Sequence, residues 1–175
     1  MTAHLPPLEP LAEVARRLDG AGITWALGGS ALLHALGLGD SVRDWDLTTD
    51  RSQDDVHAAL ADLAPTLHGN SGIHADHKVV CFDGTVEVIC RFAFFGADRE
   101  IIRIPTMVSG QWNDYPVGSP EGWAVAYALM MAEKPDRMEK ATTLFAWVQS
   151  RGDRKRAEAM LQQPLPEELR RLLQS

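Results

Sequence analysis

The chain has 175 residues, of which 45% are hydrophobic and 23% are charged. This size and composition suit one domain of ordinary dimensions with a real hydrophobic core, and they exclude a disordered chain. The formal net charge of −7 argues against broad, nonspecific binding of nucleic acid. A cluster of Arg and Lys between residues 137 and 156 indicates either a local basic patch or a solvated helix face.

Targeting segments and cysteine pairs would place the chain in a compartment. No stretch approaches about 18 uninterrupted apolar residues, and residues 1–10 lack the basic and apolar regions of a secretory signal. The two cysteines, Cys81 and Cys90, are too few to cross-link a secreted fold and lack metal-ligand spacing. We therefore expect a cytoplasmic protein without a membrane segment or a disulfide.

The first part of the chain predicts a helix, a strand, a tight turn, a second helix and a second strand. Apolar residues recur at helical spacing from Leu11 to Leu18, and an apolar strand is expected at 23–27. Gly28-Gly29 breaks this strand, and we expect Ser30 to cap the following helix. The second strand is predicted from about Arg43 to Thr49.

The middle of the chain predicts a helix followed by a β-hairpin. Ser52, with Asp55 three residues later, is typical of a helix start. Asp83-Gly84 is the strongest short hairpin signal in the chain and is expected to join strands at 78–82 and 85–94. Pairing across a two-residue turn places Glu87 opposite Val80 and gives Glu87 a definite face of the sheet.

The C-terminal part predicts one more strand and then a series of helices. The strand is expected at 100–108, interrupted by a proline, and Ser119-Pro120 is typical of a capped helix start. The predicted helices cover residues 120–133, 136–149, 153–162 and a short segment after Pro166. We therefore divide the chain into an α/β core at 1–108 and a helical C-terminal subdomain at 109–175 that packs on the core.

Two aspartates form the first chemical motif. Asp44 and Asp46 are two residues apart on the predicted strand, so their carboxylates share one face with Cα atoms about 6.6 Å apart. Trp45 and Leu47 are then directed to the core. Two carboxylates this close repel each other unless a cation lies between them. The alternative is a polar, solvated strand face, for which Asp is a poor strand former.

Together, the glycine turn and the aspartate pair resemble the signature of a known superfamily. Gly28-Gly29-Ser30 followed by Asp44-Trp45-Asp46 resembles the motif of the DNA polymerase β nucleotidyltransferase superfamily, and Glu87 falls where that family has a third carboxylate. The size, the helical tail and Ser119-Pro120-Glu121 are more similar to its small bacterial members. These include aminoglycoside and lincosamide nucleotidyltransferases and the nucleotidyltransferase toxins of type IV toxin–antitoxin systems. The resemblance implies an α+β fold with a mixed-sheet, polymerase-β-like palm and a C-terminal helical tail.

The resemblance also implies roles for the motif residues. The turn Gly28, Gly29 and Ser30 would hold the β- and γ-phosphates of a nucleoside triphosphate. Asp44 and Asp46 would bind two magnesium ions, and Glu87 would complete the site of one. Glu87 would be the general base, either directly or by completing the metal site that lowers the pKa of the acceptor hydroxyl. Hard oxygen ligands suit Mg²⁺, and two ions can stabilise both the attacking and the leaving oxygen. The implied reaction transfers a nucleoside monophosphate to an acceptor hydroxyl and releases pyrophosphate.

Basic residues also occur near the proposed site motifs. Lys134 and Arg137 lie where related small transferases have residues that contact nucleotide phosphates, and the alternative is a basic helix end. By strand alternation, Arg43 is expected to point away from the carboxylates. Asp83 is an alternative third carboxylate, but its place in the predicted turn favours Glu87.

The sequence is compatible with more than one function. The acceptor is either a small molecule or RNA, and a toxin-type enzyme would act on tRNA or on a protein and could have an antitoxin-like partner. A module of the same fold that binds nucleotide or a partner without catalysis is the alternative from another functional class. The presence of all three carboxylates argues against this last alternative.

Overall fold

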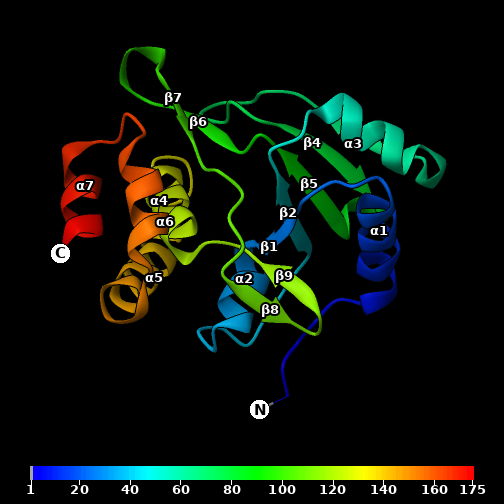
Figure 1. Ribbon diagram of the computed structural model, residues 1–175, viewed down its shortest axis with the longest axis horizontal. Helices are drawn as coiled ribbons and strands as arrows, with labels where there is room; N and C mark the ends of the chain where they lie inside the picture. Colours follow the sequence, from blue (N-terminus) through cyan, green and yellow to red (C-terminus); the bar gives the residue numbers. More distant parts are fainter. Residues whose placement is uncertain (1) are drawn as a thin grey trace.

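A computed structural model describes residues 2–175, in which a sheet layer lies beside a group of C-terminal helices (Figure 1). The main sheet comprises β1 (Ala26–Gly28), β2 (Trp45–Thr49), β3 (Thr66–His68), β4 (His77–Cys81), β5 (Val86–Cys90), β8 (Gly110–Trp112) and β9 (Tyr115–Val117). Its strand order is β3-β4-β5-β2-β1-β9-β8. The pairs β2–β5 and β1–β9 are parallel and the other pairs are antiparallel. This mixed sheet confirms the predicted α+β fold class.

The helices follow the predicted order. They are α1 (Leu8–Gly20), α2 (Gly29–Ala35), α3 (Gln53–Leu60), α4 (Pro120–Met130), α5 (Arg137–Arg151), α6 (Arg154–Leu161) and α7 (Glu167–Gln174). Ser52 caps α3 by accepting a hydrogen bond from Asp55 N, and Ser119 caps α4 by accepting one from Gly122 N. Both predicted caps are confirmed, because each depends only on a short local pattern.

The start of α2 differs from its prediction. The N-cap residue is Gly28, which is extended and makes no side-chain cap, and Gly29 follows with a φ of +57°. Ser30 therefore lies inside the helix, and its predicted role as cap is wrong. The helix cap lies two residues earlier than predicted, because glycine readily adopts the left-handed conformation that Gly29 has here.

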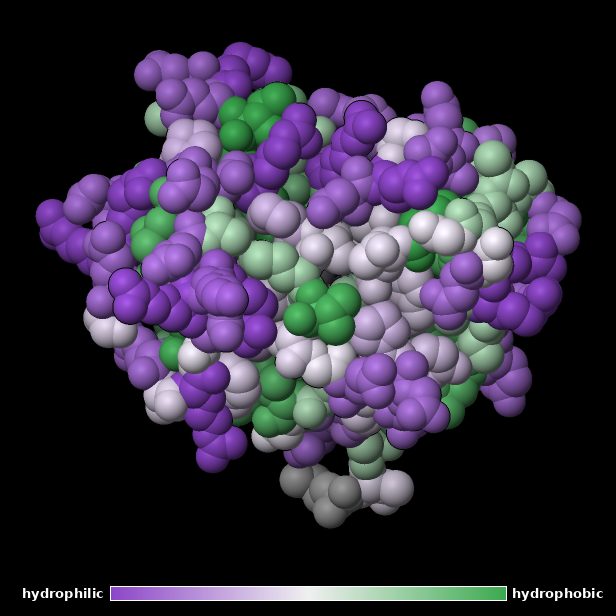
Figure 2. All heavy atoms as spheres, viewed as in Figure 1, coloured by the Kyte–Doolittle hydropathy of each residue, from purple (hydrophilic) through white to green (hydrophobic). Residues whose placement is uncertain are grey.

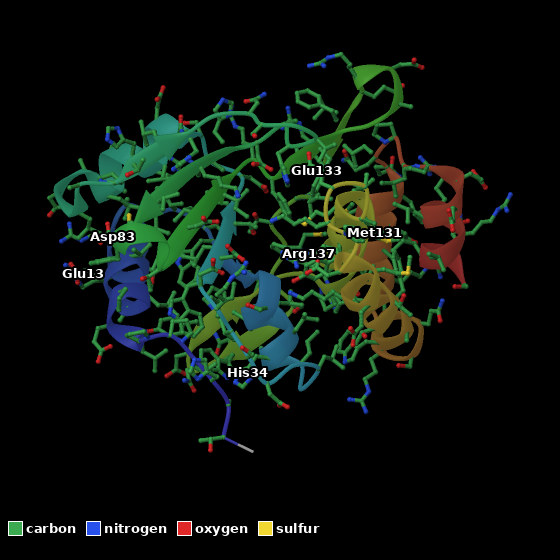
Figure 3. The ribbon with its side chains drawn as sticks, turned by 180° about the vertical axis from the view of Figure 1, so that it is seen from behind. Glu13, His34, Asp83, Met131, Glu133 and Arg137 are labelled. Atoms are coloured by element: carbon green, nitrogen blue, oxygen red, sulfur yellow. The ribbon has the colours of Figure 1, made fainter. Side chains whose placement is uncertain are left out.

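The β4–β5 hairpin has the predicted register. Val80 lies opposite Glu87, and Thr85 N donates to Phe82 O at 3.0 Å across the turn. The last ladder pair is Cys81 with Val86, so residues 82–85 connect the strands, and the predicted strand at 78–82 ends one residue early because Phe82 has a φ of +54°. Asp83 and Gly84 also have positive φ values, of 52° and 92°. Figure 3 shows Asp83 at the far tip of this hairpin, remote from Arg137 in the tail. Asp83 is thus a turn residue.

Two strand predictions need correction. The expected strand at 85–94 ends at Cys90, because Arg91 has a φ of +56° that breaks the ladder, and β6 (Ala93–Phe95) then pairs with β7 (Ile101–Arg103) in a separate sheet. The strand expected at 100–108 is correspondingly shorter. The β8–β9 hairpin was not predicted. It belongs to the main sheet although its residues follow residue 108. The domain division at 108 stays a prediction.

Hydrophobic residues form two clusters on opposite sides of the sheet. Helices α1 and α3 cover one face, where Trp45, Leu47 and Val88 are fully buried. The other cluster joins the tail helices to α2, β6 and β7 and includes Ile89 and Trp123. Because side chains alternate along a strand, Asp46 and Glu87 are directed to the face that turns toward the tail.

The surface carries small apolar groups between polar residues, as Figure 2 shows for one face. The large hydrophobic residues that are exposed are Leu8, Leu67, Phe82, Ile101, Val108 and Met138. The two cysteines are buried and free. Across residues 2–175, the structure contains no helix of the length and apolarity needed to cross a membrane.

Candidate active site

A cavity of about 510 Å³ lies between the sheet and the helical tail. It brings together most of the residues singled out from the sequence, namely Gly29, Ser30, Asp44, Asp46, Glu87, Lys134 and Arg137. Gly28 is buried behind them and does not line the cavity. Residues far apart in the sequence therefore meet in one concave site, large enough for a small-molecule ligand.

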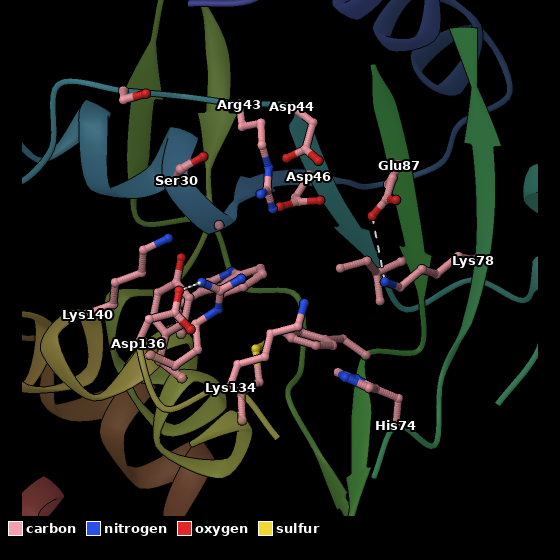
Figure 4. Close-up of a pocket in the computed structure, with 18 residues that line it drawn as sticks. Ser30, Arg43, Asp44, Asp46, His74, Lys78, Glu87, Lys134, Asp136 and Lys140 are labelled. Carbon is pink, nitrogen blue, oxygen red and sulfur yellow. Dashed lines mark hydrogen bonds and ion pairs between the residues drawn. The ribbon is translucent and has the colours of Figure 1, made fainter. Parts of the chain in front are cut away.

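The carboxylates of the core form one wall of this cavity. Because β2 and β5 pair in parallel with Asp46 opposite Glu87, both side chains lie on the same face of the sheet. Asp44 lies one residue before the start of β2, and it also lines the cavity. Figure 4 shows the three carboxylates side by side. The hairpin register predicted only the face of Glu87, and the β2–β5 pairing is what brings Glu87 beside Asp46.

The electrostatics of this wall favour a bound cation. Burial, together with the negative charges of Asp44 and Glu87, raises the pKa of Asp46 to about 7. Burial and the charge of Glu87 also raise the pKa of Asp44. A divalent cation would neutralise this repulsion, and carboxylate oxygens are ligands that Mg²⁺ accepts. The donor set therefore fits magnesium.

The three carboxylates are not gathered around a single point. Within residues 2–175, no group of three His, Cys, Asp or Glu side chains is arranged as a metal site. Instead, Glu87 Oε2 lies 3.6 Å from Lys78 Nζ, an ion pair drawn in Figure 4. Lys78 comes from β4, two residues from the partner of Glu87 in the ladder, and it lines the cavity. Sequence reasoning missed Lys78, although the predicted register already placed it on this face.

The glycine turn and the aspartate strand are in direct contact. A side chain at Gly29 would collide with the Asp46 carboxylate, and a side chain at Gly28 would collide with the Trp123 ring. The two glycines therefore allow the turn to lie against the carboxylate and against the tail. This explains the residue type at both positions without reference to a ligand.

Arg43 occupies a different position from the one predicted. It lines the cavity, and Figure 4 shows its guanidinium beside the carboxylates of Asp44 and Asp46. The prediction that Arg43 points away is wrong, because β2 begins at Trp45 and strand alternation does not extend back to residue 43. The cavity thus has a cation on the carboxylate wall.

The opposite wall comes from the tail and is basic. It includes Lys134, Arg137 and Lys140 from the segment that joins α4 to α5 and from the first turn of α5. Arg137 Nη1 pairs with Asp136 Oδ2 at 2.9 Å, while Lys140 Nζ lies 5.5 Å from the centre of the Tyr127 ring. Figure 4 shows Lys134 and Lys140 facing the carboxylates across the cavity. An anionic ligand would fit between this wall and cations bound by the carboxylates.

A short contact fixes the tail against the core at the rim of the cavity. Glu133 Oε1 accepts a hydrogen bond from Ile73 N at 3.1 Å, and Glu133 Oε2 lies 3.8 Å from His74 Nε2. His74 Nδ1 lies 3.9 Å from the buried Asp76. Burial lowers the pKa of His74, which favours a neutral ring at this position. We interpret His74 as part of the contact between tail and core.

Comparisons with known proteins bear on the fold. No family model matches the sequence, and no curated protein matches it. A candidate nucleotidyltransferase of Thermotoga maritima, TM1012, is similar with a TM-score of 0.53 and 20% identity, over 85% of this chain and 98% of that chain. ANT(2'')-Ia in complex with adenylyl-2''-tobramycin gives a TM-score of 0.56 and 16% identity, over 95% and 96% of the two chains.

The solution structure of ANT(2'')-Ia, described as an antibiotic-resistance factor, gives a TM-score of 0.53 and 16% identity over 86% of each chain. All these matches extend over most of both proteins, so the similarity covers the sheet and the tail together. It agrees with the resemblance found in the sequence motifs. The chain therefore has the fold of these nucleotidyltransferase structures.

Proposed function

We propose that the protein is a magnesium-dependent nucleotidyltransferase that moves a nucleoside monophosphate from a nucleoside triphosphate to an acceptor hydroxyl. The observation that carries this proposal is the meeting of Asp44, Asp46 and Glu87 on one wall of a cavity whose other wall is basic. A carboxylate wall facing a basic wall suits a metal-bound triphosphate.

Asp44 and Asp46 are the proposed principal metal ligands, since burial and the charges of neighbouring carboxylates raise both pKa values and a bound cation would offset these effects. Bound magnesium would stabilise both the attacking oxygen and the leaving pyrophosphate oxygen. Glu87 is available to the same centre once its carboxylate leaves Lys78. Release from this partly exposed ion pair costs little, because such pairs contribute on the order of 1 kcal/mol.

The triphosphate is proposed to lie between the glycine turn and the basic wall. Gly29 and Ser30 offer backbone N–H groups and a hydroxyl on the core side, behind which Gly28 supports the turn. Lys134 and Arg137 provide positive charge on the tail side. Negative charge builds up on the leaving pyrophosphate, and this wall would stabilise that charge.

In the proposed reaction, the acceptor oxygen attacks the α-phosphorus and forms a new P–O bond. The bond between the α-phosphorus and the bridging oxygen of pyrophosphate breaks, and the electron pair leaves with pyrophosphate. Glu87 accepts the proton of the acceptor hydroxyl, for which it must lie within hydrogen-bond reach of that hydroxyl. Atoms and charges balance without any further reactant.

A small molecule with a hydroxyl group is the proposed acceptor. The structure of ANT(2'')-Ia was solved with an adenylylated aminoglycoside, which makes aminoglycosides the first compounds to test. If the acceptor is RNA, or if the enzyme is of the toxin type, tRNA is the acceptor to add to the same assay. Because nucleoside triphosphates are cytoplasmic metabolites, the proposed substrate agrees with the location expected from the sequence.

The proposal is tested by incubating the protein with each labelled nucleoside triphosphate, Mg²⁺ and either aminoglycosides or pooled tRNA. We expect labelled product and pyrophosphate, both lost in Asp46→Ala and retained in the exposed control Asp40→Ala. Binding of nucleoside triphosphate without release of pyrophosphate would favour the noncatalytic module. Failure to bind any nucleoside triphosphate in the presence of Mg²⁺ would contradict both functions.

A further inference from the structure

Two buried hydrogen-bond donors at the cavity lack an acceptor. Across residues 2–175, the Tyr127 hydroxyl and Arg137 Nε are among the few buried side-chain atoms without a hydrogen-bond partner. Tyr127 is only 3% exposed. Most buried polar groups in proteins are hydrogen-bonded, and leaving one unpaired costs about 1–3 kcal/mol. The third such atom, His74 Nδ1, also belongs to a cavity-lining residue, but it lies 3.9 Å from Asp76 Oδ2. The Tyr127 hydroxyl and Arg137 Nε therefore need another explanation.

Both atoms belong to the basic wall. Tyr127 comes from α4 and Arg137 is the first residue of α5, and both side chains line the cavity that holds the carboxylates. Figure 3 shows Arg137 on the side of the tail that faces the core. The Lys140 ammonium lies 5.5 Å from the centre of the Tyr127 ring and adds a second positive charge.

The Tyr127 hydroxyl is a donor placed between opposite charges. Burial raises the pKa of the phenol, so the hydroxyl keeps its proton. The other charges acting on this phenol are Asp46 and Asp44 from the core and Arg137 from the tail. The Tyr127 side chain lines the cavity in which the substrate is proposed to lie.

The chemistry of these groups selects the ligand. A phenol hydroxyl with its proton and a guanidinium N–H can both donate, and an ammonium group lies beside them. A group that accepts several hydrogen bonds and carries negative charge satisfies all three, and a phosphate oxygen has both properties. Hydrogen bonds from charged donors to phosphate are also among the stronger ones in proteins.

We propose that the Tyr127 hydroxyl and Arg137 Nε jointly bind a phosphate group of the substrate, which makes Tyr127 a substrate-binding residue. This inference rests on the proposed function and adds a residue that no sequence motif indicated. The alternative is a purely structural tyrosine that packs on Trp123, whose ring centre lies 5.6 Å away. A phenylalanine would pack equally well there, so only the ligand-binding explanation predicts that removal of the hydroxyl raises the Kd.

The experiment uses the full chain and the substitution Tyr127→Phe. If the hydroxyl serves the ligand, the Tm of the ligand-free variant is equal to or higher than that of the wild type, because an unpaired buried group is removed. The Kd for ATP with Mg²⁺, measured by calorimetry, rises about tenfold, as expected for one hydrogen bond to a charged group. Tyr115→Phe is the matched control, since Tyr115 is the other tyrosine of the chain and does not line the cavity.

Three probes identify the phosphate. Equal weakening of ATP and inorganic tripolyphosphate in Tyr127→Phe places the contact on the β- or γ-phosphate, and equal weakening of ATP and AMP places it on the α-phosphate. The inference is overturned if all three bind the variant as tightly as the wild type, or if Tyr127→Phe lowers the Tm without changing any Kd. Loss of ATP binding by the wild type itself would instead contradict the proposed function.

A second variant tests whether the two residues share one ligand group. Arg137→Lys keeps the positive charge and removes the Nε–H donor. If both donors bind the same phosphate, the effects of Tyr127→Phe and Arg137→Lys on the Kd for tripolyphosphate are not additive in the double variant. Additive effects would show that the two donors act on separate groups and would overturn the joint site.

Discussion

Two buried carboxylates in this protein have opposite surroundings. Glu121 at the start of α4 is fully buried, and its carboxylate accepts hydrogen bonds from Arg156 Nε at 2.9 Å, from Asp153 N at 2.7 Å and from the Ser119 hydroxyl at 2.9 Å. Asp46 in the cavity has two other carboxylates as its strongest charged neighbours. The charge of Glu121 is compensated by partners within the chain, so this site is electrostatically complete. The charge of Asp46 lies among other negative charges, so that site is incomplete.

The difference separates a structural site from a functional one. A buried charge with all its partners holds elements together, and here Glu121 joins the start of α4 to the turn between α5 and α6. A group of like charges destabilises the folded chain and persists where a ligand compensates it. Substitutions should therefore change stability in one region and activity in the other.

The largest expected effect is on catalysis at the incomplete site. Asp46→Asn should reduce nucleotidyl transfer by at least about a thousandfold, since it removes a ligand charge from the proposed metal centre. The same substitution should leave the Tm of the metal-free protein unchanged or higher, because repulsion is relieved. Single-turnover assays and thermal unfolding measure both effects. A fall of several degrees in Tm would show that Asp46 has a structural role, as Glu121 has, and would contradict the proposed difference between the two carboxylates.

The second effect is on stability at the complete site. Glu121→Ala should lower the free energy of unfolding by about 3–5 kcal/mol, because Arg156 would stay partly buried without its partner. Urea unfolding measures this loss. The control is Glu158→Ala, which removes an exposed pair with Arg154 and should cost less than about 1 kcal/mol. Equal losses in the two variants would contradict the structural role of Glu121.

The sequence predicted the parts of the molecule that depend on short patterns. The caps at Ser52 and Ser119 and the hairpin register at Asp83-Gly84 are set by neighbouring residues, so each could be predicted without tertiary information. The register gave Glu87 a definite face of its strand, and the family resemblance grouped it with Asp44 and Asp46. The parallel β2–β5 pairing that brings Asp46 opposite Glu87 was not predicted.

The remainder depends on contacts between distant segments. The turn at Gly29 is set by the Asp46 carboxylate from a later strand, and the place of Arg43 depends on where β2 begins. Tyr127 fits the helical pattern of α4, and only the meeting of the tail with the core reveals that its hydroxyl lacks a partner. Periodicity predicts which face of a helix is buried, but it does not show which buried polar group awaits a ligand.

The third effect is a pH dependence of stability in the metal-free protein. The pKa of Asp46 is about 7 in the folded chain and about 3.9 in an unfolded chain, so between these values the folded state holds a proton that the unfolded state has lost. Stability should therefore fall as the pH rises from 4 to 7, by up to about 2–4 kcal/mol from this group.

Urea unfolding in a chelating buffer at pH 5 and pH 8 measures this fall. Asp46→Asn should remove most of the pH dependence that Asp46 contributes, whereas the exposed control Asp40→Asn should keep it. An unchanged pH dependence in Asp46→Asn would assign the effect to other groups and would weaken the view of Asp46 as an uncompensated carboxylate.

The smallest effect concerns Lys78, which partly compensates the carboxylate wall within the chain. Its ion pair with Glu87 is partly exposed on both sides, so Lys78→Met should change the free energy of unfolding by less than about 1 kcal/mol. The Kd for Mg²⁺ should change more than the stability does. Lys78→Met removes a positive charge beside the carboxylates, so it should tighten Mg²⁺ binding to the nucleotide-free protein severalfold at low salt, while Lys78→Arg should leave the Kd unchanged. Calorimetric titration with Mg²⁺ measures this change. Weaker Mg²⁺ binding in Lys78→Met would show that Lys78 positions the carboxylates for the metal. The carboxylate wall would then depend on a partner within the chain, as Glu121 does.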